Sequence, residues 1–221
     1  MLTIILTSYN RPYLLTRALN SLLGQKDERW KCLLLDDGSD DHTLSVIQDF
    51  EDERIKVTRW ETPDETRKTS SRYAVLINSV LPQLTEGILG YLCDNVEYHS
   101  ALVGTVLDYF EANPAYSGYV IHMRDVWLRR GRDGLKPLGT ATAFGHWEIC
   151  PRLQLDEIVS PDEKLDHSQV FHRLPVDVRW DEGIETVKHG DGVFFEKFVQ
   201  RHGPIKAIAP GKILTLEHLL A

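Results

Sequence analysis

The sequence contains little cysteine and no long apolar run. Its three cysteines, Cys32, Cys93 and Cys150, are far apart and show no C-x-x-C spacing, so we expect buried reduced thiols rather than a zinc site or a disulfide framework. No apolar run approaches the roughly 20 residues that cross a bilayer, and no signal peptide is visible at the N-terminus. We therefore expect a cytoplasmic protein without a transmembrane segment, docked at most peripherally at the inner face of a membrane.

An excess of positive charge is also missing. The formal net charge is −8 over 221 residues, which argues against nucleic acid as a main partner because phosphate binding needs a basic face. The arginines between Arg124 and Arg132 form a local exception. Hydrophobic residues make up 42% of the chain, which is ordinary for a globular protein. We expect one domain.

The first hundred residues alternate between strand and helix patterns. This order predicts an α/β fold with a mostly parallel sheet and right-handed crossovers. Asn10 is the expected N-cap of the first helix. The expected strands are 2–6, 30–35, 54–60 and 88–93, and the expected helices are 12–23, 40–50, 70–81 and 100–111.

The second half of the chain is less regular. Residues 115–130 read as strand, 130–134 as a hairpin turn, 142–150 as a further strand and 190–199 as a helix. We expect residues 1–98 to form a nucleotide-binding half and residues 99–221 to complete the site within a single domain, 1–221.

Polar residues follow the first two strands where each strand ends. Thr7, Ser8, Tyr9 and Asn10 follow the first, and Asp36 with Asp37 ends the second. The carboxyl ends of strands in an open α/β sheet hold its ligand-binding loops. Two acids at such an edge can hydrogen-bond a base and a ribose, so these stretches predict a nucleotide pocket.

The fourth strand ends in Cys93, Asp94 and Asn95. A carboxylate there is well placed to hold Mg²⁺ or Mn²⁺ against a diphosphate, since these ions take one or two protein carboxylates and phosphate oxygens. The alternative is that Asp94 and Asn95 cap the following helix.

Three other stretches leave two interpretations open. The basic residues from Arg67 to Arg72 either pair with phosphates or form a solvated surface. Asp191, between two glycines, is either a helix N-cap or an accessible general base. His167 and His172 are five residues apart, which does not match a helical zinc pair and favours a structural role or an acceptor contact.

These stretches together resemble the inverting glycosyltransferases of family two, which have the GT-A (Rossmann-like) fold. The resemblance covers about residues 2–200 and rests on seven elements in the same order. They are Thr7–Asn10, Asp36–Asp37, Arg67–Asn78, Cys93–Asn95, Asp166–His167, Trp180–Glu182 and Gly190–Asp191.

The resemblance implies a role for each matching residue. Asp94 would bind the metal, Mn²⁺ or Mg²⁺, and Asp191 would be the general base. Tyr9 would stack on the base of a UDP or dTDP sugar. The implied nucleotide-binding set is Thr7, Tyr9, Asp36, Asp37, Arg67 and Cys93, and the donor-sugar or acceptor candidates are His167, Trp180, Asp181 and Glu182.

Cys93 departs from the family pattern, which usually has an acid at that position. The resemblance implies transfer of a sugar to a carbohydrate or other hydroxyl acceptor, with a small strand-rich region on the acceptor side of the sheet. Two alternatives remain. The loss of one acid motivates a non-catalytic nucleotide-sugar-binding module as an alternative, and a sugar nucleotidyltransferase is disfavoured because no glycine-rich phosphate loop is present.

Overall fold

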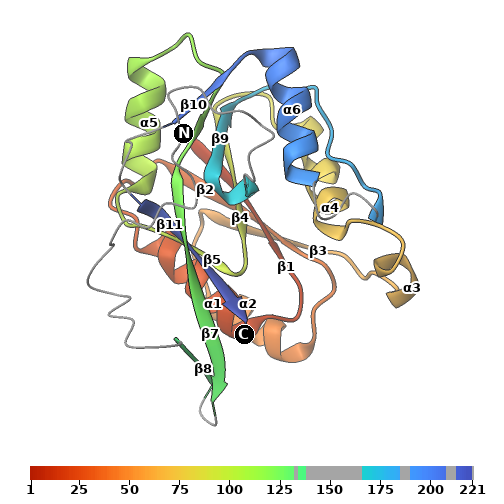
Figure 1. Ribbon diagram of the computed structural model, residues 1–221. Coiled ribbons are helices and arrows are strands. Elements are labelled where there is room, and N and C mark those ends of the chain that lie inside the picture. Colours follow the sequence, from red (N-terminus) through yellow and green to blue (C-terminus); the bar gives the residue numbers. More distant parts are fainter. Residues whose placement is uncertain (132–133, 138–165, 185–189, 208–212, 221) are drawn as a thin grey trace.

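The computed structural model describes residues 1–131, 134–137, 166–184, 190–207 and 213–220 (Figure 1). The expected strand 142–150, with Phe144 and Trp147, lies outside these residues. Eleven strands and six α-helices are described, together with two short 3₁₀ helices, η1 (Leu81–Gln83) and η2 (His167–Gln169).

A seven-stranded sheet forms the centre of the molecule, in the order β10-β6-β9-β4-β1-β2-β3. The four strands that the sequence predicts run parallel to one another, while β9 is antiparallel to both of its neighbours. The predicted mostly parallel α/β sheet is confirmed. The strands are β1 (Leu2–Ser8), β2 (Trp30–Asp36), β3 (Ile55–Arg59), β4 (Ile88–Cys93), β6 (Gly118–Val120), β9 (Val170–Arg173) and β10 (Ile205–Ala207).

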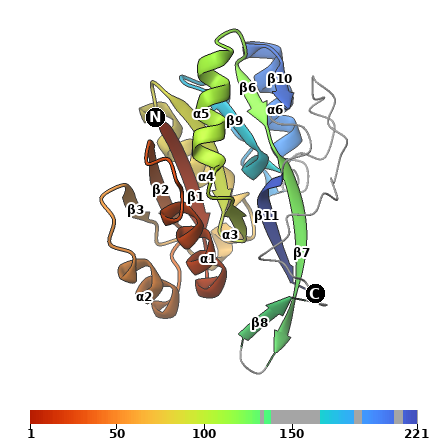
Figure 2. The same cartoon turned by 90° about the vertical axis from the view of Figure 1, so that its left-hand side faces the viewer.

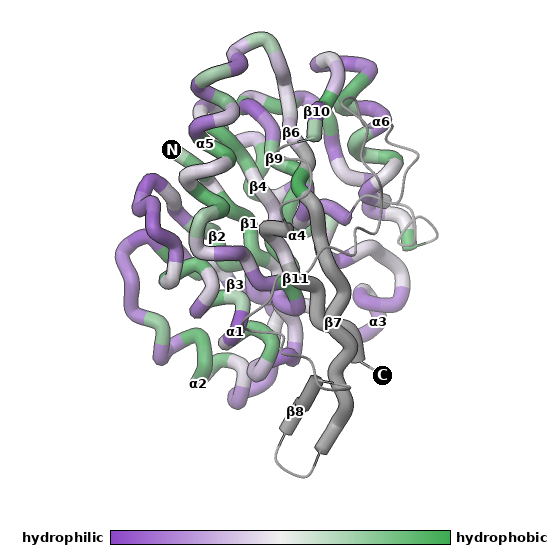
Figure 3. The backbone as a smooth tube through the Cα atoms, turned by 60° about the vertical axis from the view of Figure 1, so that its left-hand side comes forward, coloured by the Kyte–Doolittle hydropathy of each residue, from purple (hydrophilic) through white to green (hydrophobic). Residues whose placement is uncertain are grey.

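Helices cover both faces of this sheet. The alternation of β1 places Leu2, Ile4 and Leu6 in one apolar cluster and Ile5 in the other, as the two-residue period of a strand requires. Helices α1 (Pro12–Leu23), α2 (Asp41–Asp49) and α5 (Leu102–Ala112) pack on the first face, and α4 (Arg72–Val80) and α6 (Gly190–His202) pack on the second. The hydrophobic segments of the chain accordingly follow the central strands (Figure 3).

A second, four-stranded sheet lies beside the first. It has the order β5-β11-β7-β8, from β5 (Val96–Tyr98), β7 (His122–Gly131), β8 (Gly134–Pro137) and β11 (Ile213–Leu220). The β7–β8 hairpin confirms the turn predicted near Arg130, and it projects beyond the helices (Figure 2). The predicted continuous strand from 115 to 130 is divided in two at Ile121.

The predicted N-cap of α1 is wrong. Arg11 occupies the N-cap position, without a side-chain hydrogen bond, and Asn10 has a φ of 51°, in the left-handed region that asparagine tolerates. The Asn10 side-chain oxygen instead accepts a hydrogen bond from the Asp40 backbone N–H at 2.7 Å. It thereby joins the loop after β1 to the start of α2.

Candidate active site

The strand register brings the predicted polar residues to one edge of the sheet. Ser8 pairs with Asp36 across β1 and β2, and Thr7 pairs with Cys93 across β1 and β4. Parallel strands in this register end together, so the residues that follow them share one edge. Asn10 and Ser39 connect two of these loops, because the Asn10 N–H donates to the Ser39 hydroxyl at 3.0 Å.

A cavity of about 440 Å³ opens at this edge, within the size range of small-ligand sites. Its lining combines most of the predicted site residues with neighbours that were not assigned individual roles. The predicted ones are Thr7, Tyr9, Asp37, Arg67, Cys93, Asp94 and His167, and the others are Ser8, Arg11, Arg72, Tyr73 and Leu76.

Asp37 is the centre of one wall of the cavity. Arg67 forms an ion pair with it, and Arg72 donates to Oδ1 at 2.9 Å. The Thr62 hydroxyl donates to the same oxygen at 2.7 Å. Gly38 follows with a φ of 79°, and a Cβ atom there would lie 2.6 Å from the Trp60 carbonyl oxygen, so glycine is required at this turn.

Arg67 also lies over the ring of Tyr9. Its guanidinium carbon is 3.7 Å from the ring centroid, a cation–π contact that joins Asp37 and Tyr9 into one wall. The Tyr9 residue is still 38% exposed. It therefore keeps surface on which a planar group could stack.

Asp94 is almost completely buried at the floor of the cavity. Its Oδ2 accepts from the Ser8 hydroxyl at 3.2 Å and from the Tyr9 N–H at 3.4 Å, while its Oδ1 accepts from Arg11 at 3.0 Å. Burial raises the pKa of this carboxyl, and the charge and hydrogen bond of Arg11 act against that rise. The predicted alternative, a cap on the next helix, is not what Asp94 forms, because Ala101 is the N-cap of α5.

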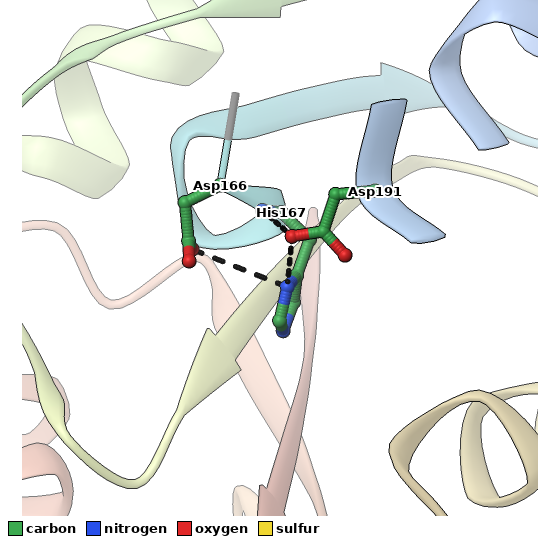
Figure 4. A group of neighbouring side chains, drawn as sticks. All are labelled: Asp166, His167 and Asp191. Carbon is green, nitrogen blue, oxygen red and sulfur yellow. Dashed lines mark hydrogen bonds and ion pairs between the residues drawn. The ribbon is translucent and has the colours of Figure 1, made fainter. Parts of the chain in front are cut away.

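Asp191 lies in the first turn of α6, next to His167 (Figure 4). Its Oδ2 is 2.9 Å from both the backbone nitrogen and Nδ1 of His167. The Tyr73 hydroxyl donates to Oδ1 at 3.2 Å. A Cβ atom at Gly190 would clash with the Tyr73 hydroxyl oxygen, so a side chain there would require Tyr73 to shift away from Asp191.

His167 connects Asp191 to Cys93, because its Nε2 is 3.0 Å from the Cys93 Sγ. Burial acts to lower the pKa of His167, but its neighbours Cys93 and Asp191 outweigh it and place that pKa well above its ordinary value. Burial also raises the pKa of the Cys93 thiol, so Asp191 is the charged neighbour at neutral pH. Burial likewise acts to raise the pKa of Asp191, and the charge and hydrogen bonds of His167 hold it below its usual range. The structure thus favours a carboxylate at Asp191 beside a charged imidazole.

Five of the predicted site residues do not line this cavity. Asp191 is one of them, and it is hydrogen-bonded to the lining residues His167 and Tyr73. Asp36 is fully buried beneath the cavity and accepts from the Ser39 N–H at 3.1 Å. Trp180 is a core residue, stacked on Phe194 with ring centroids 4.1 Å apart. Asp181 accepts from the Gly183 N–H, and Glu182 accepts from the Asn78 side chain.

Comparison with known proteins shows which sequences the chain resembles. Residues 3–76 match the model for glycosyl transferase family 2. Protein CgeD of Bacillus subtilis (strain 168) is 29% identical over 209 residues, which are 88% of this chain and 45% of that protein. A UDP-Glc:alpha-D-GlcNAc-diphosphoundecaprenol beta-1,3-glucosyltransferase, WfgD of Escherichia coli, is 32% identical over 77 residues, 34% of this chain and 30% of WfgD.

Solved structures show the same fold. TarS of S. aureus in complex with UDP superimposes with a TM-score of 0.72 at 18% identity, covering 99% of this chain and 60% of that chain. The mannosyltransferase PcManGT from Pyrobaculum calidifontis, in complex with GDP-Man and Mn²⁺, gives a TM-score of 0.60 at 15% identity, covering 98% and 56%. The chain has the GT-A fold, its residues 3–76 match glycosyl transferase family 2, and it spans less than half the length of the curated relatives it matches.

Because the PcManGT structure contains Mn²⁺, we ask whether the cavity of this protein could hold a divalent cation. Asp94 is the one carboxylate among the described cavity residues at the end of β4, and one carboxylate with phosphate oxygens suffices for Mg²⁺ or Mn²⁺. Its Oδ1 accepts from Arg11, whose side chain is 52% exposed. The donor set fits a cation once Arg11 moves.

A second group of possible metal-ligating atoms consists of Asp166, His167 and Asp191. The Asp166 carboxylate accepts from the Ser168 N–H at 2.7 Å in a capping box at the start of η2. Asp191 is held by His167 and Tyr73, as described above. A metal ion at this group would have to displace hydrogen bonds that these atoms already form.

Among the described residues, none of the helices is both long and apolar enough to span a membrane.

Proposed function

We propose that this protein is a family 2 glycosyltransferase that transfers a sugar from a UDP or dTDP sugar to an acceptor hydroxyl, with inversion at the anomeric carbon. One observation carries the proposal. A single cavity joins a nucleoside-type wall at Tyr9 and Asp37 to the Asp94 carboxylate and, through His167, to Asp191. The UDP in a TarS structure supports the choice of a uridine-type donor.

The donor side of the site consists of residues from the first half of the chain. Tyr9 would stack on the base, while Asp37 and Arg67 would offer an acceptor and donors to its polar edge. Thr7 and Cys93 lie where the sugar and phosphates would follow. We propose that residues 1–98 hold the donor and residues 99–221 complete one domain on the acceptor side.

Asp94 would hold Mn²⁺ or Mg²⁺, which would neutralise negative charge on the leaving diphosphate. Arg67 and Arg72 already neutralise Asp37, so the Asp37 carboxylate does not repel the donor. The buried position of Asp94 strengthens any cation contact that it makes, because little water screens it. These residues bind and orient the donor.

Asp191 is the proposed general base. Ionised at neutral pH, its carboxylate would accept the proton of the acceptor hydroxyl as that oxygen attacks the anomeric carbon from the side opposite the diphosphate. His167 and Tyr73 fix both carboxylate oxygens by hydrogen bonds and thereby position the base. His167 is the candidate among the four acceptor-side residues that also lines the cavity.

One observation favours a second candidate, a non-catalytic module that binds nucleotide sugars. Cys93 stands where the family usually has an acid, and Arg11 pairs with the remaining Asp94. Such a module would bind UDP without releasing it from any UDP sugar. The rate of UDP release from a UDP sugar therefore distinguishes the two candidates.

The test compares wild type with Asp191→Asn, using Asp49→Asn on the exposed side of α2 as the matched control. UDP affinity is measured by calorimetry, and UDP release from UDP-sugars with water as acceptor is measured with Mn²⁺ present. We expect Asp191→Asn to keep the UDP affinity and to lose about 100-fold or more in release rate.

If Asp191→Asn released UDP at the wild-type rate, Asp191 would not be the general base. UDP binding by wild type without release from any donor would favour the binding module, and no binding of UDP or dTDP would overturn the proposed donor class.

A further inference from the structure

The two oxygens of Asp94 are held in different ways. Oδ2 is bound by the Ser8 hydroxyl and the Tyr9 N–H, groups fixed at the end of β1. Oδ1 is bound by Nη1 of Arg11, a long side chain that is 52% exposed. Exchange of one ligand for another is therefore far easier at Oδ1, where only a flexible and solvated side chain has to move.

Arg11 is less firmly held than the other two arginines of the cavity. Arg67 and Arg72 both pair with Asp37, and their side chains are 14% and 17% exposed. Arg11 would lose its partner as soon as a divalent cation took Oδ1. Its guanidinium would then lie near that cation, and the two positive charges would repel each other in a poorly solvated site.

A diphosphate removes this conflict. Its oxygens can bind the cation on one side and accept paired hydrogen bonds from a guanidinium on the other. Arg11 and the cation would thus exclude each other at Asp94 in the donor-free protein and become compatible when a nucleoside diphosphate lies between them.

We propose that Arg11 is a diphosphate-binding residue that competes with the divalent cation for Asp94. In the donor-free protein Arg11 holds Oδ1 and weakens binding of the cation alone. When donor and cation bind together, Arg11 transfers from Asp94 to the diphosphate. This inference rests on the proposed function, and it predicts that cation and nucleotide bind cooperatively.

The test measures Mn²⁺ binding by electron paramagnetic resonance and UDP binding by calorimetry, each with and without the other ligand. The variants are Arg11→Gln and Arg11→Lys, with Arg54→Gln as the matched control. Arg54 also forms an arginine–aspartate pair, with Asp52, away from the cavity. Melting temperatures check that each variant folds.

In wild type we expect UDP to tighten Mn²⁺ binding about tenfold or more, in line with known couplings between sites. Arg11→Gln should bind Mn²⁺ alone more tightly, bind UDP alone more weakly and show less coupling. Arg11→Lys keeps the charge and should lie between the two. Arg54→Gln should match wild type.

Three results would overturn the proposal. Arg11→Gln and Arg11→Lys could leave both affinities unchanged, which would make the pair an ordinary surface contact. Wild type could bind UDP with no effect on Mn²⁺. Mn²⁺ could bind Asp94→Asn as tightly as wild type, which would place the ion elsewhere. Absence of UDP binding in wild type would instead overturn the proposed function, so the two failures are distinguishable.

Discussion

At the scale of single residues, two buried histidines show how neighbours decide charge. His167 faces Asp191 and Cys93, and its pKa lies well above the ordinary value. His172 is fully buried on β9, where its Nε2 meets the Tyr91 hydroxyl at 2.9 Å. Burial lowers the pKa of His172 from its ordinary value of 6.5 to about 4. Between about pH 4 and pH 6.5, the folded protein therefore keeps His172 neutral, whereas an unfolded chain would protonate it.

This difference predicts a pH dependence of stability. The folded pKa of His172 is depressed, so its contribution is fully present above about pH 6.5 and is lost as pH falls toward about 4. Between pH 7 and pH 4.5 we expect wild type to lose about 2 kcal/mol more unfolding free energy than His172→Gln, measured by urea denaturation. Tyr91→Phe keeps the histidine and should keep the wild-type pH slope. Equal slopes for wild type and His172→Gln would contradict the assignment.

Much of the candidate site could be predicted at this scale. Asp37, Asp94 and Tyr9 each follow a strand with a clear apolar pattern, so chain order alone places them at one edge. Arg11 and Tyr73 gave no comparable signal, because their roles depend on contacts with Asp94 and Asp191 over 80 residues away along the chain. The sequence makes Trp180 a donor-sugar or acceptor candidate, whereas its packing against Phe194 makes it a core residue.

At the scale of elements, the start of α2 is a local feature with a clear energetic role. The Asp40 side chain accepts from the Thr43 backbone N–H at 2.8 Å and from its hydroxyl at 2.8 Å. This N-cap satisfies a helix N–H that would otherwise lack a partner. Asn10 binds the Asp40 backbone, so the cap also lies next to the loop that carries Tyr9.

Replacement of the cap should therefore affect stability directly. We expect Asp40→Ala to lower the unfolding free energy by about 1 kcal/mol, the usual cost of losing such a cap, in urea denaturation at pH 7. Asp49→Ala removes an exposed acid from the other end of the same helix and should change it by less than about 0.5 kcal/mol. If Asp40→Ala lowered the unfolding free energy no more than Asp49→Ala does, the Asp40 side chain would not stabilise the start of α2.

Elements with strong local periodicity were predictable, and short strands were not. The leucine-rich β1, β2 and β4 and the apolar face of α1 match their predicted ranges closely. β9 has four residues and exists because Phe171 and His172 pair with strands on both sides. A register of this kind depends on long-range pairing, so the sequence of β9 alone does not indicate it.

At the scale of the whole molecule, the two halves of the chain are interleaved. Strand β9 from the second half lies between β4 and β6, and α6 packs with α4 on the same face of the sheet. One apolar cluster contains Ile5 and Phe195 together, so neither half has a core of its own. The halves should unfold together.

Scanning calorimetry tests this cooperativity. We expect one transition for the whole chain, and UDP at 100 times its dissociation constant should stabilise that transition by about 2.7 kcal/mol. Two transitions, of which UDP shifts only the earlier or the later, would show that the donor half folds independently. The acceptor-side variant Asp181→Asn, outside the cavity, should show the same ligand shift as wild type.

The position of β9 has a consequence for the order in which the molecule is made. On the ribosome, β4 emerges with β1 as a neighbour, but its other edge has no partner until Val170 and the residues after it have been synthesised. The nascent chain therefore carries the apolar sequence Ile-Leu-Gly-Tyr-Leu-Cys as a bare sheet edge through much of translation. Unpaired apolar edges of this kind recruit other strands. Yield during expression should thus depend on synthesis speed and on chaperones that cover this edge.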